Sequence, residues 1–273
     1  MDDGAVAHHY HLGDLEDVIM AGIAAAGLEV TALSAADLTP VDEFHLGGAA
    51  ATSDLTSQLG LTDAVCLLDV GCGIGGPARH VAAEHGCEIV GVDLTDEHLQ
   101  LANRLNAMVG LDDLVRCERA SALALPYEAE SFDGAYMLHV GMNIEDKARL
   151  CAEVARVLRP GGFFAIYDVM RVGPGEVDYP LPWASTPDIS FVEAPARYRE
   201  LLEAAGFMVT ASRDRREFAI EFVRRVRAAS SSDVPPPLGL HLVMGADFGA
   251  KMANLIASLT AETFAPVEVI AVL

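Results

Sequence analysis

Basic residues are scarce in this chain, and it lacks long apolar runs. Its 18 lysines and arginines face 40 acidic residues, and only Lys147 and Lys251 are lysines, so the formal net charge is −22. Such a charge would repel nucleic acid and anionic membranes, and we expect neither as a partner. No apolar run reaches the roughly 20 residues that span a bilayer, and the acidic N-terminal stretch lacks the basic start of a signal peptide. We therefore expect a cytoplasmic globular protein without membrane insertion.

Paired cysteines are also missing. The five cysteines, Cys66, Cys72, Cys87, Cys117 and Cys151, form no C-x-x-C motif. Their odd number and wide spacing argue against both a disulfide framework and a zinc site. We expect reduced, mostly buried thiols and no metal.

Strand and helix patterns alternate from residue 65 onward. Strands are predicted at 65–70, 88–93, 114–119, 131–138 and 162–169, with helices at 75–85, 95–110 and 144–158 between them. Five strands separated by helical crossovers indicate an α/β fold with a doubly wound parallel sheet. A loop rich in proline and glycine follows at 171–190. Beyond it we predict a helix at 194–206, a strand at 207–214, helices at about 215–229 and 239–262, and a terminal strand at 266–273.

The first 60 residues have a different pattern from the rest of the chain. Helices are predicted at 13–27 and 49–60, with a loop at 39–48 between them. We therefore divide the chain into an N-terminal helical segment, 1–60, and a core, 61–273. The helical insertion at about 215–262 within that core could be a cap over the sheet edge or only a helical layer.

A glycine-rich loop, "LLDVGCGIGGPARH" at 67–80, follows the first strand of the core. Gly71, Gly73 and Gly76 satisfy the G-x-G-x-x-G dinucleotide fingerprint, whereas Asp69, Gly71, Gly73 and Gly75 satisfy D-x-G-x-G. A carboxylate at Asp69 would repel a pyrophosphate but would suit a cationic ligand such as S-adenosylmethionine. The glycines allow the backbone to approach that ligand closely.

Four ordered segments resemble the successive motifs of class I S-adenosylmethionine-dependent methyltransferases: "LLDVGCGIGGPARH", "IVGVDLT", "ASALALPYEAESFDGAYM" and "VARVLRPGGFFAIYDV". They are most similar to the small-molecule group that includes ubiquinone/menaquinone, tocopherol, sterol and sarcosine/dimethylglycine methyltransferases. The resemblance covers residues 40–215. It implies a Rossmann-like seven-stranded sheet with an antiparallel last strand, an N-terminal helical lid, and S-adenosylmethionine as cofactor.

The resemblance also implies a set of cofactor-binding residues. Asp93, at the end of the second strand, corresponds to the carboxylate that accepts hydrogen bonds from the ribose. Ser121 stands where the family often has an aspartate beside the adenine, which puts that contact in doubt. The complete set implied at the cofactor is Asp69, Gly71, Cys72, Gly73, Gly75, Asp93, Leu94, Ser121, Ala122, Leu138, His139, Tyr10 and His45.

Three polar residues near the ends of the fourth and fifth strands are candidates for catalysis. His139 directly follows the fourth strand and could be a general base, a cofactor contact or a core histidine. Asn143 stands where many relatives carry a histidine, which removes one familiar base. Asp168 lies near the end of the fifth strand, where it could face the substrate or cap a turn.

The substrate side is less well defined by the sequence. The candidate substrate-binding residues are Met142, Tyr179, Trp183, His241 and Met244. The run "HVGMNIEDK" resembles sarcosine/dimethylglycine methyltransferases, so our first expectation is a small amine acceptor, whose carboxylate Arg171 or Arg197 would bind. The alternative is O- or C-methylation of an apolar quinol, phenol or terpenoid-like metabolite. A protein that binds the cofactor without catalysis, and an NAD-dependent oxidoreductase, are hypotheses of another class. The apolar C-terminal helices could equally form a homodimer interface.

Overall fold

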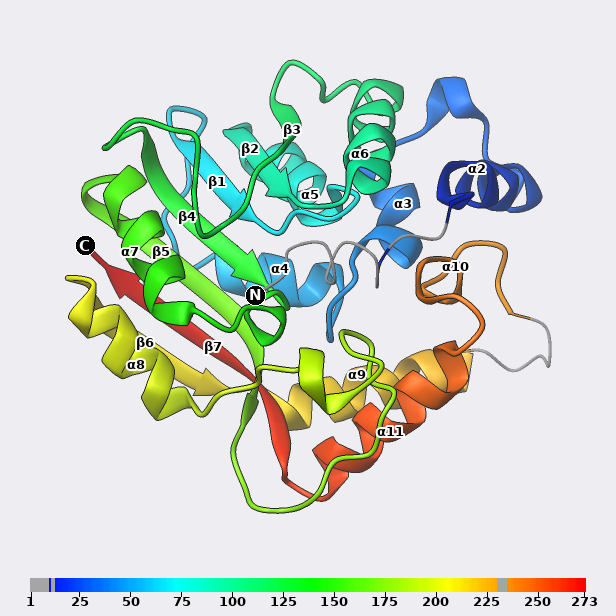
Figure 1. Cartoon of the computed structure of the whole chain (residues 1–273). Helices are drawn as coiled ribbons and strands as arrows, with labels where there is room; N and C mark the ends of the chain where they lie inside the picture. The colour runs from blue at the N-terminus through cyan, green and yellow to red at the C-terminus, as the bar shows by residue number, and fades with distance from the viewer. Residues whose placement is uncertain (1–9, 11–12, 230–234) are drawn as a thin grey trace.

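A single seven-stranded sheet forms the centre of the molecule (Figure 1). The computed structural model describes Tyr10, residues 13–229 and residues 235–273, with the side chains of 227–229 left out. The strand order is β3-β2-β1-β4-β5-β7-β6; β1 to β5 pair in parallel, and β7 runs antiparallel to both β5 and β6. The strands are β1 (Cys66–Val70), β2 (Glu88–Asp93), β3 (Val115–Arg119), β4 (Phe132–Leu138), β5 (Leu158–Arg171), β6 (Met208–Asp214) and β7 (Phe264–Val272). The Rossmann-like sheet with an antiparallel last strand is thus confirmed.

Helices cover both faces of the sheet because alternate residues of a strand point to opposite sides. On one face, Leu68 and Val70 of β1 pack with α7 (Lys147–Val157) and α8 (Pro195–Ala204). On the other face, Leu67 of β1 packs with α4 (Ala49–Thr56), α5 (Gly76–His85) and α6 (Asp96–Met108). Two apolar clusters therefore enclose the sheet, as a doubly wound fold requires.

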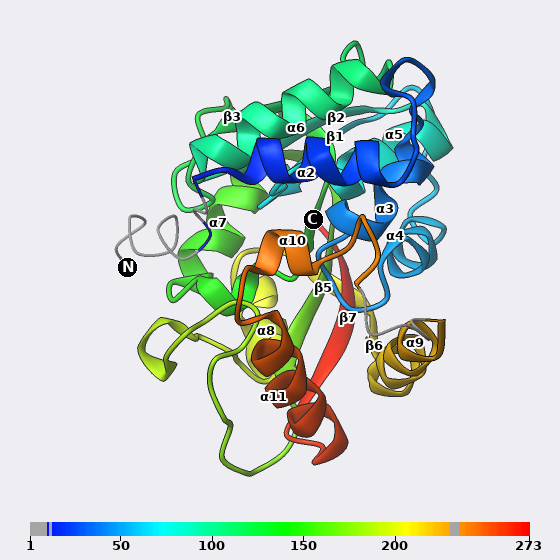
Figure 2. The same cartoon turned by 90° about the vertical axis from the view of Figure 1, so that its right-hand side faces the viewer.

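Two segments far apart in the sequence meet beside this sheet. Helices α2 (Leu15–Ala25) and α3 (Ala35–Asp42) come from the N-terminal part, and α9 (Arg216–Ala229), α10 (His241–Met244) and α11 (Phe248–Thr260) connect β6 to β7. Ile19 of α2 belongs to the same apolar cluster as Leu105 of α6 and Leu238, which precedes α10. Figure 2 shows α10 lying against α2 and α3.

The predicted elements differ from the observed ones in the helices and in β5, which spans Leu158–Arg171 instead of 162–169. Residues 39–42, predicted as loop, belong to α3, which contains Pro40. Pro40 has no N–H for the Ala36 carbonyl, and the Thr39 hydroxyl donates to that carbonyl instead (3.0 Å). The helix predicted over 239–262 is interrupted because Gly245 has a φ of 72°, which separates α10 from α11. No helix in the described ranges is long and apolar enough to cross a membrane.

Candidate functional site

A cavity of about 1180 Å³ lies at the carboxyl ends of the parallel strands. Its walls come from the loops after β1, β2 and β4, from the loop between α3 and α4 (residues 43–48), and from the α9–α11 insertion. Cavities that hold one drug-sized ligand are typically about 300–1,000 Å³. This cavity is therefore large enough for a nucleoside cofactor and a second molecule.

The glycine-rich loop presents its backbone to the cavity. The N–H groups of Gly71 and Cys72 donate to the Val92 carbonyl (2.8 and 3.0 Å), which folds the loop over β2. A Cβ on Gly71 would lie 2.4 Å from Val140, whereas a Cβ on Gly73 would meet nothing within 4 Å. Gly71 is required by packing, and Gly73 leaves open space into which a ligand can approach the backbone.

Asp93 is held at the edge of the cavity by two backbone groups. Its Oδ2 accepts from the N–H of Gly73 (3.0 Å) and its Oδ1 from the N–H of Thr95 (2.9 Å). A carboxylate has further lone pairs, so both oxygens can still accept hydrogen bonds from a ligand such as a ribose diol. Leu94, Ser121 and Ala122 line the adjoining wall, and the Ser121 hydroxyl oxygen already accepts from the N–H of Leu123 (3.3 Å).

Asp69 and Gly75 do not line the cavity, although both were predicted at the cofactor. Asp69 is 2% exposed, and its burial beneath the loop raises the pKa of its carboxyl well above the usual range. Gly75 precedes α5 and donates its N–H to the Cys72 carbonyl (2.8 Å). This geometry favours support of the loop over the direct ligand contact that the sequence predicted.

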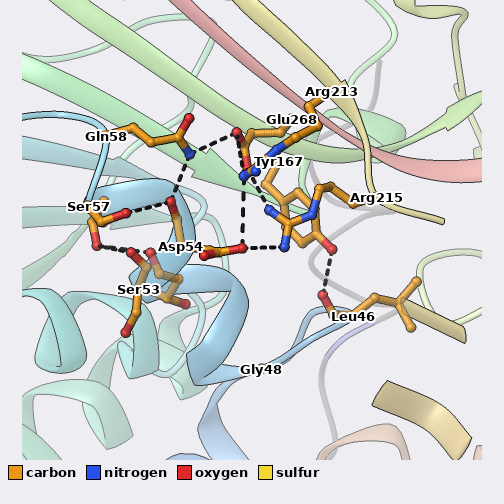
Figure 3. A network of polar contacts seen from close by, with 12 residues as sticks. Leu46, Gly48, Ser53, Asp54, Ser57, Gln58, Tyr167, Arg213, Arg215 and Glu268 are labelled. Atoms are coloured by element: carbon orange, nitrogen blue, oxygen red, sulfur yellow. Dashed lines mark hydrogen bonds and ion pairs between the residues drawn. The ribbon is translucent and has the colours of Figure 1, made fainter. Parts of the chain in front are cut away.

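His139 lines the cavity but is engaged on both ring nitrogens. Its Nδ1 lies 3.1 Å from the Tyr167 carbonyl, which can only accept, so Nδ1 carries the proton. Its Nε2 accepts from the N–H of Leu46 (3.4 Å), and burial lowers its pKa to about 4. The Tyr167 hydroxyl donates to the Leu46 carbonyl (2.8 Å; Figure 3). His139 and Tyr167 thus fix the 43–48 loop, and His139 is a weaker base candidate than predicted.

Asn143 connects three separate segments at the cavity. Its Oδ1 accepts from the Tyr10 hydroxyl (2.9 Å), and its Nδ2 donates to the Trp183 carbonyl (2.8 Å). Tyr10 also makes edge contacts with the rings of Phe44 and His98. Both hydrogen bonds engage the amide, so Asn143 joins the N-terminal segment to the loop after β5, and Tyr10 lines the cavity as predicted.

Asp168 does not line the cavity, which argues against the substrate role that the sequence predicted. Its side chain is fully buried and accepts from the Tyr198 hydroxyl (2.5 Å) on α8. Burial raises the pKa of this carboxyl to about 6. A Cβ on Gly141 would lie 2.2 Å from Asp168 Oδ2, so the carboxyl is packed beneath the 3₁₀ turn after β4.

The predicted substrate-binding residues also divide into those that line the cavity and one that does not. Met142, Trp183, His241 and Met244 line the cavity, but Tyr179 packs outside it against the α9–α11 cluster. Most of the apolar wall was missed by the sequence reasoning: Phe44, Phe222, Val223, Leu238, Val243, Phe248, Met252, Leu255 and Ile256. Apart from Phe44 on the 43–48 loop, their signal was the apolar stripe of the insertion, which serves as core and as cavity wall at once, as the 3% exposure of Leu255 shows.

The 43–48 loop also brings two ionisable groups that lack charge near neutral pH. Glu43 accepts from the Thr52 hydroxyl (2.8 Å), and burial raises its pKa to about 8. His45, a predicted cofactor residue, lies with Nε2 3.1 Å from the Gly48 carbonyl, and burial lowers its pKa to about 3. Glu43 was missed, because its burial depends on the packing of α3 against α5.

Positive charge is scarce around the cavity. Among the described lining residues, Arg225 is the one arginine and lysine is absent. Arg171 lies over the Phe264 ring (5.1 Å), and Arg197 pairs with Glu200 (3.1 Å); neither lines the cavity. This placement argues against the carboxylate-binding role expected for either arginine. The described residues also contain no group of three metal-binding side chains.

Comparison with known sequences places a methyltransferase domain at residues 68–166. The chain is 34% identical over 137 residues to the methyltransferase GfsG of Streptomyces halstedii. The matched region covers 50% of this chain and 49% of that protein. It is 35% identical over 114 residues to 24-methylenesterol C-methyltransferase 2 of Oryza sativa subsp. japonica. This matched region covers 42% of this chain and 31% of that protein. The matched part thus spans half or less of these relatives.

Solved structures match over a longer part of the chain. The geranyl diphosphate C-methyltransferase of Streptomyces coelicolor A3(2), solved with Mg²⁺, geranyl diphosphate and S-adenosyl-L-homocysteine, has a TM-score of 0.65 at 19% identity, covering 82% of this chain and 80% of that one. The [4+2]-cyclase SpnF has a TM-score of 0.65 at 21% identity, covering 97% of this chain and 96% of that one. Residues 68–166 thus match a methyltransferase domain, and the chain has the fold of the solved S-adenosylmethionine-dependent methyltransferases.

Proposed function

We propose that this protein transfers a methyl group from S-adenosylmethionine to a small, uncharged, apolar molecule. The observation that carries the proposal is the division of one cavity into two parts. Gly71, Gly73 and Asp93 form a polar wall suited to a nucleoside with an amino-acid tail. Helices α9–α11 form an apolar wall large enough for a second molecule.

The polar part fits the cofactor without phosphate recognition. The open side of Gly73 admits the methionyl portion, and the backbone-held carboxylate of Asp93 accepts from the ribose hydroxyls. When bound, S-adenosylmethionine supplies an activated methyl group on a sulfonium. A carboxylate at the end of the second strand could accept from the ribose of NAD as well, so Asp93 does not distinguish the two cofactors.

The apolar part determines the acceptor class. Trp183, Met142 and Phe222 line it with other apolar side chains, and they would exclude water from a methyl transfer that works mainly through positioning. A zwitterion such as sarcosine would need a cation for its carboxylate, and Arg225 is the single candidate in the described lining. The apolar acceptor is therefore better supported than the amine that the sequence first suggested.

The relatives favour carbon among the atoms that could be methylated. A sterol C-methyltransferase and a geranyl diphosphate C-methyltransferase are similar to this chain in sequence and in fold, respectively. C-methylation of an alkene requires a proton to leave after the transfer, whereas O-methylation requires one to leave before it. His139 and His45 line the cavity, and their ring nitrogens are already hydrogen-bonded, so we propose neither as a general base.

Calorimetry and turnover test this proposal separately. We expect purified protein to bind S-adenosylmethionine and S-adenosylhomocysteine but not NAD, and to methylate members of a panel of sterol- and terpenoid-like alkenes rather than sarcosine or dimethylglycine. Phenols and quinols in the same panel distinguish oxygen from carbon as the acceptor atom. Binding of NAD alone would overturn the proposal, and cofactor binding without transfer to any compound would favour a non-catalytic role.

A further inference from the structure

Two of the buried thiols meet on the floor of the cofactor half of the cavity. Gly91 of β2 lies between β1 and β3, in register with Asp69 on one side and Cys117 on the other. A Cβ added to Gly91 would lie 2.7 Å from the Cys72 sulfur and 3.1 Å from the Cys117 sulfur. Both sulfurs therefore share the space that the glycine leaves free.

The two thiols differ in chemical state and in access. The neighbouring Cys72 thiol is the main cause that lowers the pKa of Cys117, whereas the pKa of Cys72 is raised well above its usual range. Cys72 lines the cavity, and Cys117 lies one layer below, near the Asn106 amide (3.9 Å). A small oxidant in the cavity thus meets Cys72 directly, and one layer separates it from the Cys117 thiol, whose lowered pKa favours reaction.

The other cysteines are placed differently. Cys66 begins β1 and Cys87 precedes β2, at the amino ends of these strands, and Cys151 lies on α7 against the opposite face of the sheet. They do not line the cavity. Among the five free thiols, Cys72 and Cys117 are the pair placed beside a proposed cofactor.

We propose that Cys72 and Cys117 form an oxidation site, in which a peroxide converts the two thiols to a disulfide when the cofactor half is empty. This inference rests on the proposed binding of S-adenosylmethionine. The ionised thiol of the pair attacks one peroxide oxygen, the O–O bond breaks, and the departing hydroxide takes up the proton that this thiol released and leaves as water. The second thiol then attacks the sulfenic sulfur, an S–S bond forms, and the S–O bond breaks to release a second water. The two thiols lose two electrons and the peroxide is reduced to two waters.

Closure of this bond would distort the cofactor loop. An S–S bond is about 2.05 Å long, so it draws Cys72 toward β3. The N–H of Cys72 is bonded to Val92, and the next residue, Gly73, holds the Asp93 carboxylate. Moving Cys72 therefore displaces the two groups that recognise the ribose and the methionyl tail. A bound cofactor covers Cys72 and protects the pair.

The test treats the reduced, full-length protein with hydrogen peroxide in the presence and absence of saturating S-adenosylmethionine. Mass spectrometry of unreduced proteolytic peptides locates the crosslink, and calorimetry measures cofactor affinity before oxidation, after it and after re-reduction. We expect a 72–117 crosslink that the cofactor suppresses, and an affinity loss of roughly tenfold or more that a thiol reductant reverses.

Two serine variants make the result specific. Cys117→Ser should bind the cofactor as the parent does and should lose its sensitivity to peroxide, whereas Cys66→Ser should keep that sensitivity. Absence of a 72–117 peptide, a crosslink that the cofactor does not suppress, or unchanged affinity in the crosslinked protein would each overturn the proposal. Failure of the reduced protein to bind S-adenosylmethionine would instead overturn the proposed function, and peptide mapping would still show whether the pair oxidises.

Discussion

At the scale of single residues, the cofactor half depends on one carboxylate that the backbone holds in place. Asp93→Asn keeps the shape of the side chain but removes its charge and one acceptor oxygen. Hydrogen bonds to charged groups contribute about 1.5–3 kcal/mol, so we expect affinity for S-adenosylmethionine to fall roughly 10- to 100-fold. Calorimetry measures this change directly.

The matched control for this substitution lies three residues away. Asp96 is exposed and pairs with Arg119 on the surface (3.1 Å), a type of pair that contributes little. Asp96→Asn should leave the affinity unchanged. Equal affinities for the Asp93→Asn variant and the parent would remove Asp93 from the cofactor site.

The cavity histidines give the stability of the protein a defined pH dependence. Burial lowers the pKa of His139 to about 4 and that of His45 to about 3, from 6.5 in an unfolded chain. Below pH 6.5 the unfolded state therefore takes up protons that the folded state does not, and stability falls as the pH drops from 6.5 toward 4. Asp168 acts in the opposite direction, because its raised pKa of about 6 makes the folded state take up a proton first.

His139→Asn isolates one contribution to this dependence. Asparagine tolerates the positive φ of 57° at this position and does not titrate. We expect the variant to lose less of its Tm than the parent does between pH 6.5 and 4 in thermal unfolding. Parallel curves for His139→Asn and the parent would contradict the lowered pKa.

The residue types in the cofactor half could be predicted from their spacing. The sequence could not show whether the carboxylates of Asp69 and Asp168 point into the cavity. Asp93 ends β2, so its side chain reaches the cavity. Asp69 precedes the last residue of β1 and is buried beneath the loop. The fifth strand was expected to end at residue 169, but β5 continues to Arg171, so Asp168 lies inside the strand. A shift of two residues in a strand end thus decides whether a carboxylate meets the cavity.

At the scale of elements, a partly buried polar network joins α4, Arg215 just before α9, and β7 (Figure 3). Arg215 donates to Glu268 (3.0 Å) and to Asp54 (2.5 Å). Its guanidinium also lies over the Phe218 ring (4.3 Å), and Phe218 packs so closely on Gly47 that a Cβ there would lie 2.4 Å away. The network therefore supports the 43–48 loop from behind.

Glu268→Gln tests the strength of this network. Glu268 is 2% exposed, and the substitution leaves the buried Arg215 guanidinium without its full partner. Breaking a buried ion pair on one side costs about 3–5 kcal/mol, which urea unfolding would measure. Glu262→Gln is the matched control. Glu262 pairs with Arg216 (3.1 Å), but its side chain is 69% exposed. Its substitution should therefore cost less than about 1 kcal/mol of stability. Equal midpoints for the two variants would contradict a supporting role.

Hydrophobic patterns predicted nearly every strand and helix. The apolar runs of the strands and the helical spacing of apolar residues were both regular within the core. It could not decide whether the insertion is a cap or a layer. Leu255 and Val223 belong to an apolar cluster and also line the cavity, and a stripe of apolar residues has the same pattern in both roles. The break at Gly245 was missed because glycine inside an apolar stretch is tolerated in helices.

At the scale of the whole molecule, the cavity is closed by parts of the chain that are distant in sequence. The N-terminal helices α2 and α3 meet α10 of the insertion, and Tyr10 reaches Asn143 on the loop after β4. These contacts connect residues more than 130 positions apart. Local patterns contain no information about such pairs, so they predicted the separate elements but could not show that these elements share one cavity.

Because the N-terminal segment and the α9–α11 insertion both contact one cavity, a ligand there should stabilise the whole fold. A ligand that binds only the folded state at 100 times its Kd adds about 2.7 kcal/mol to the free energy of unfolding. For a chain of this size, S-adenosylmethionine should therefore raise Tm by roughly 5–10 °C. Hydrogen exchange should slow in α2 and α10 as well as in the glycine loop, since these helices pack together beside the cavity. NAD at the same concentration should leave Tm unchanged, and protection confined to the glycine loop would show that the two enclosing parts do not respond to the cofactor.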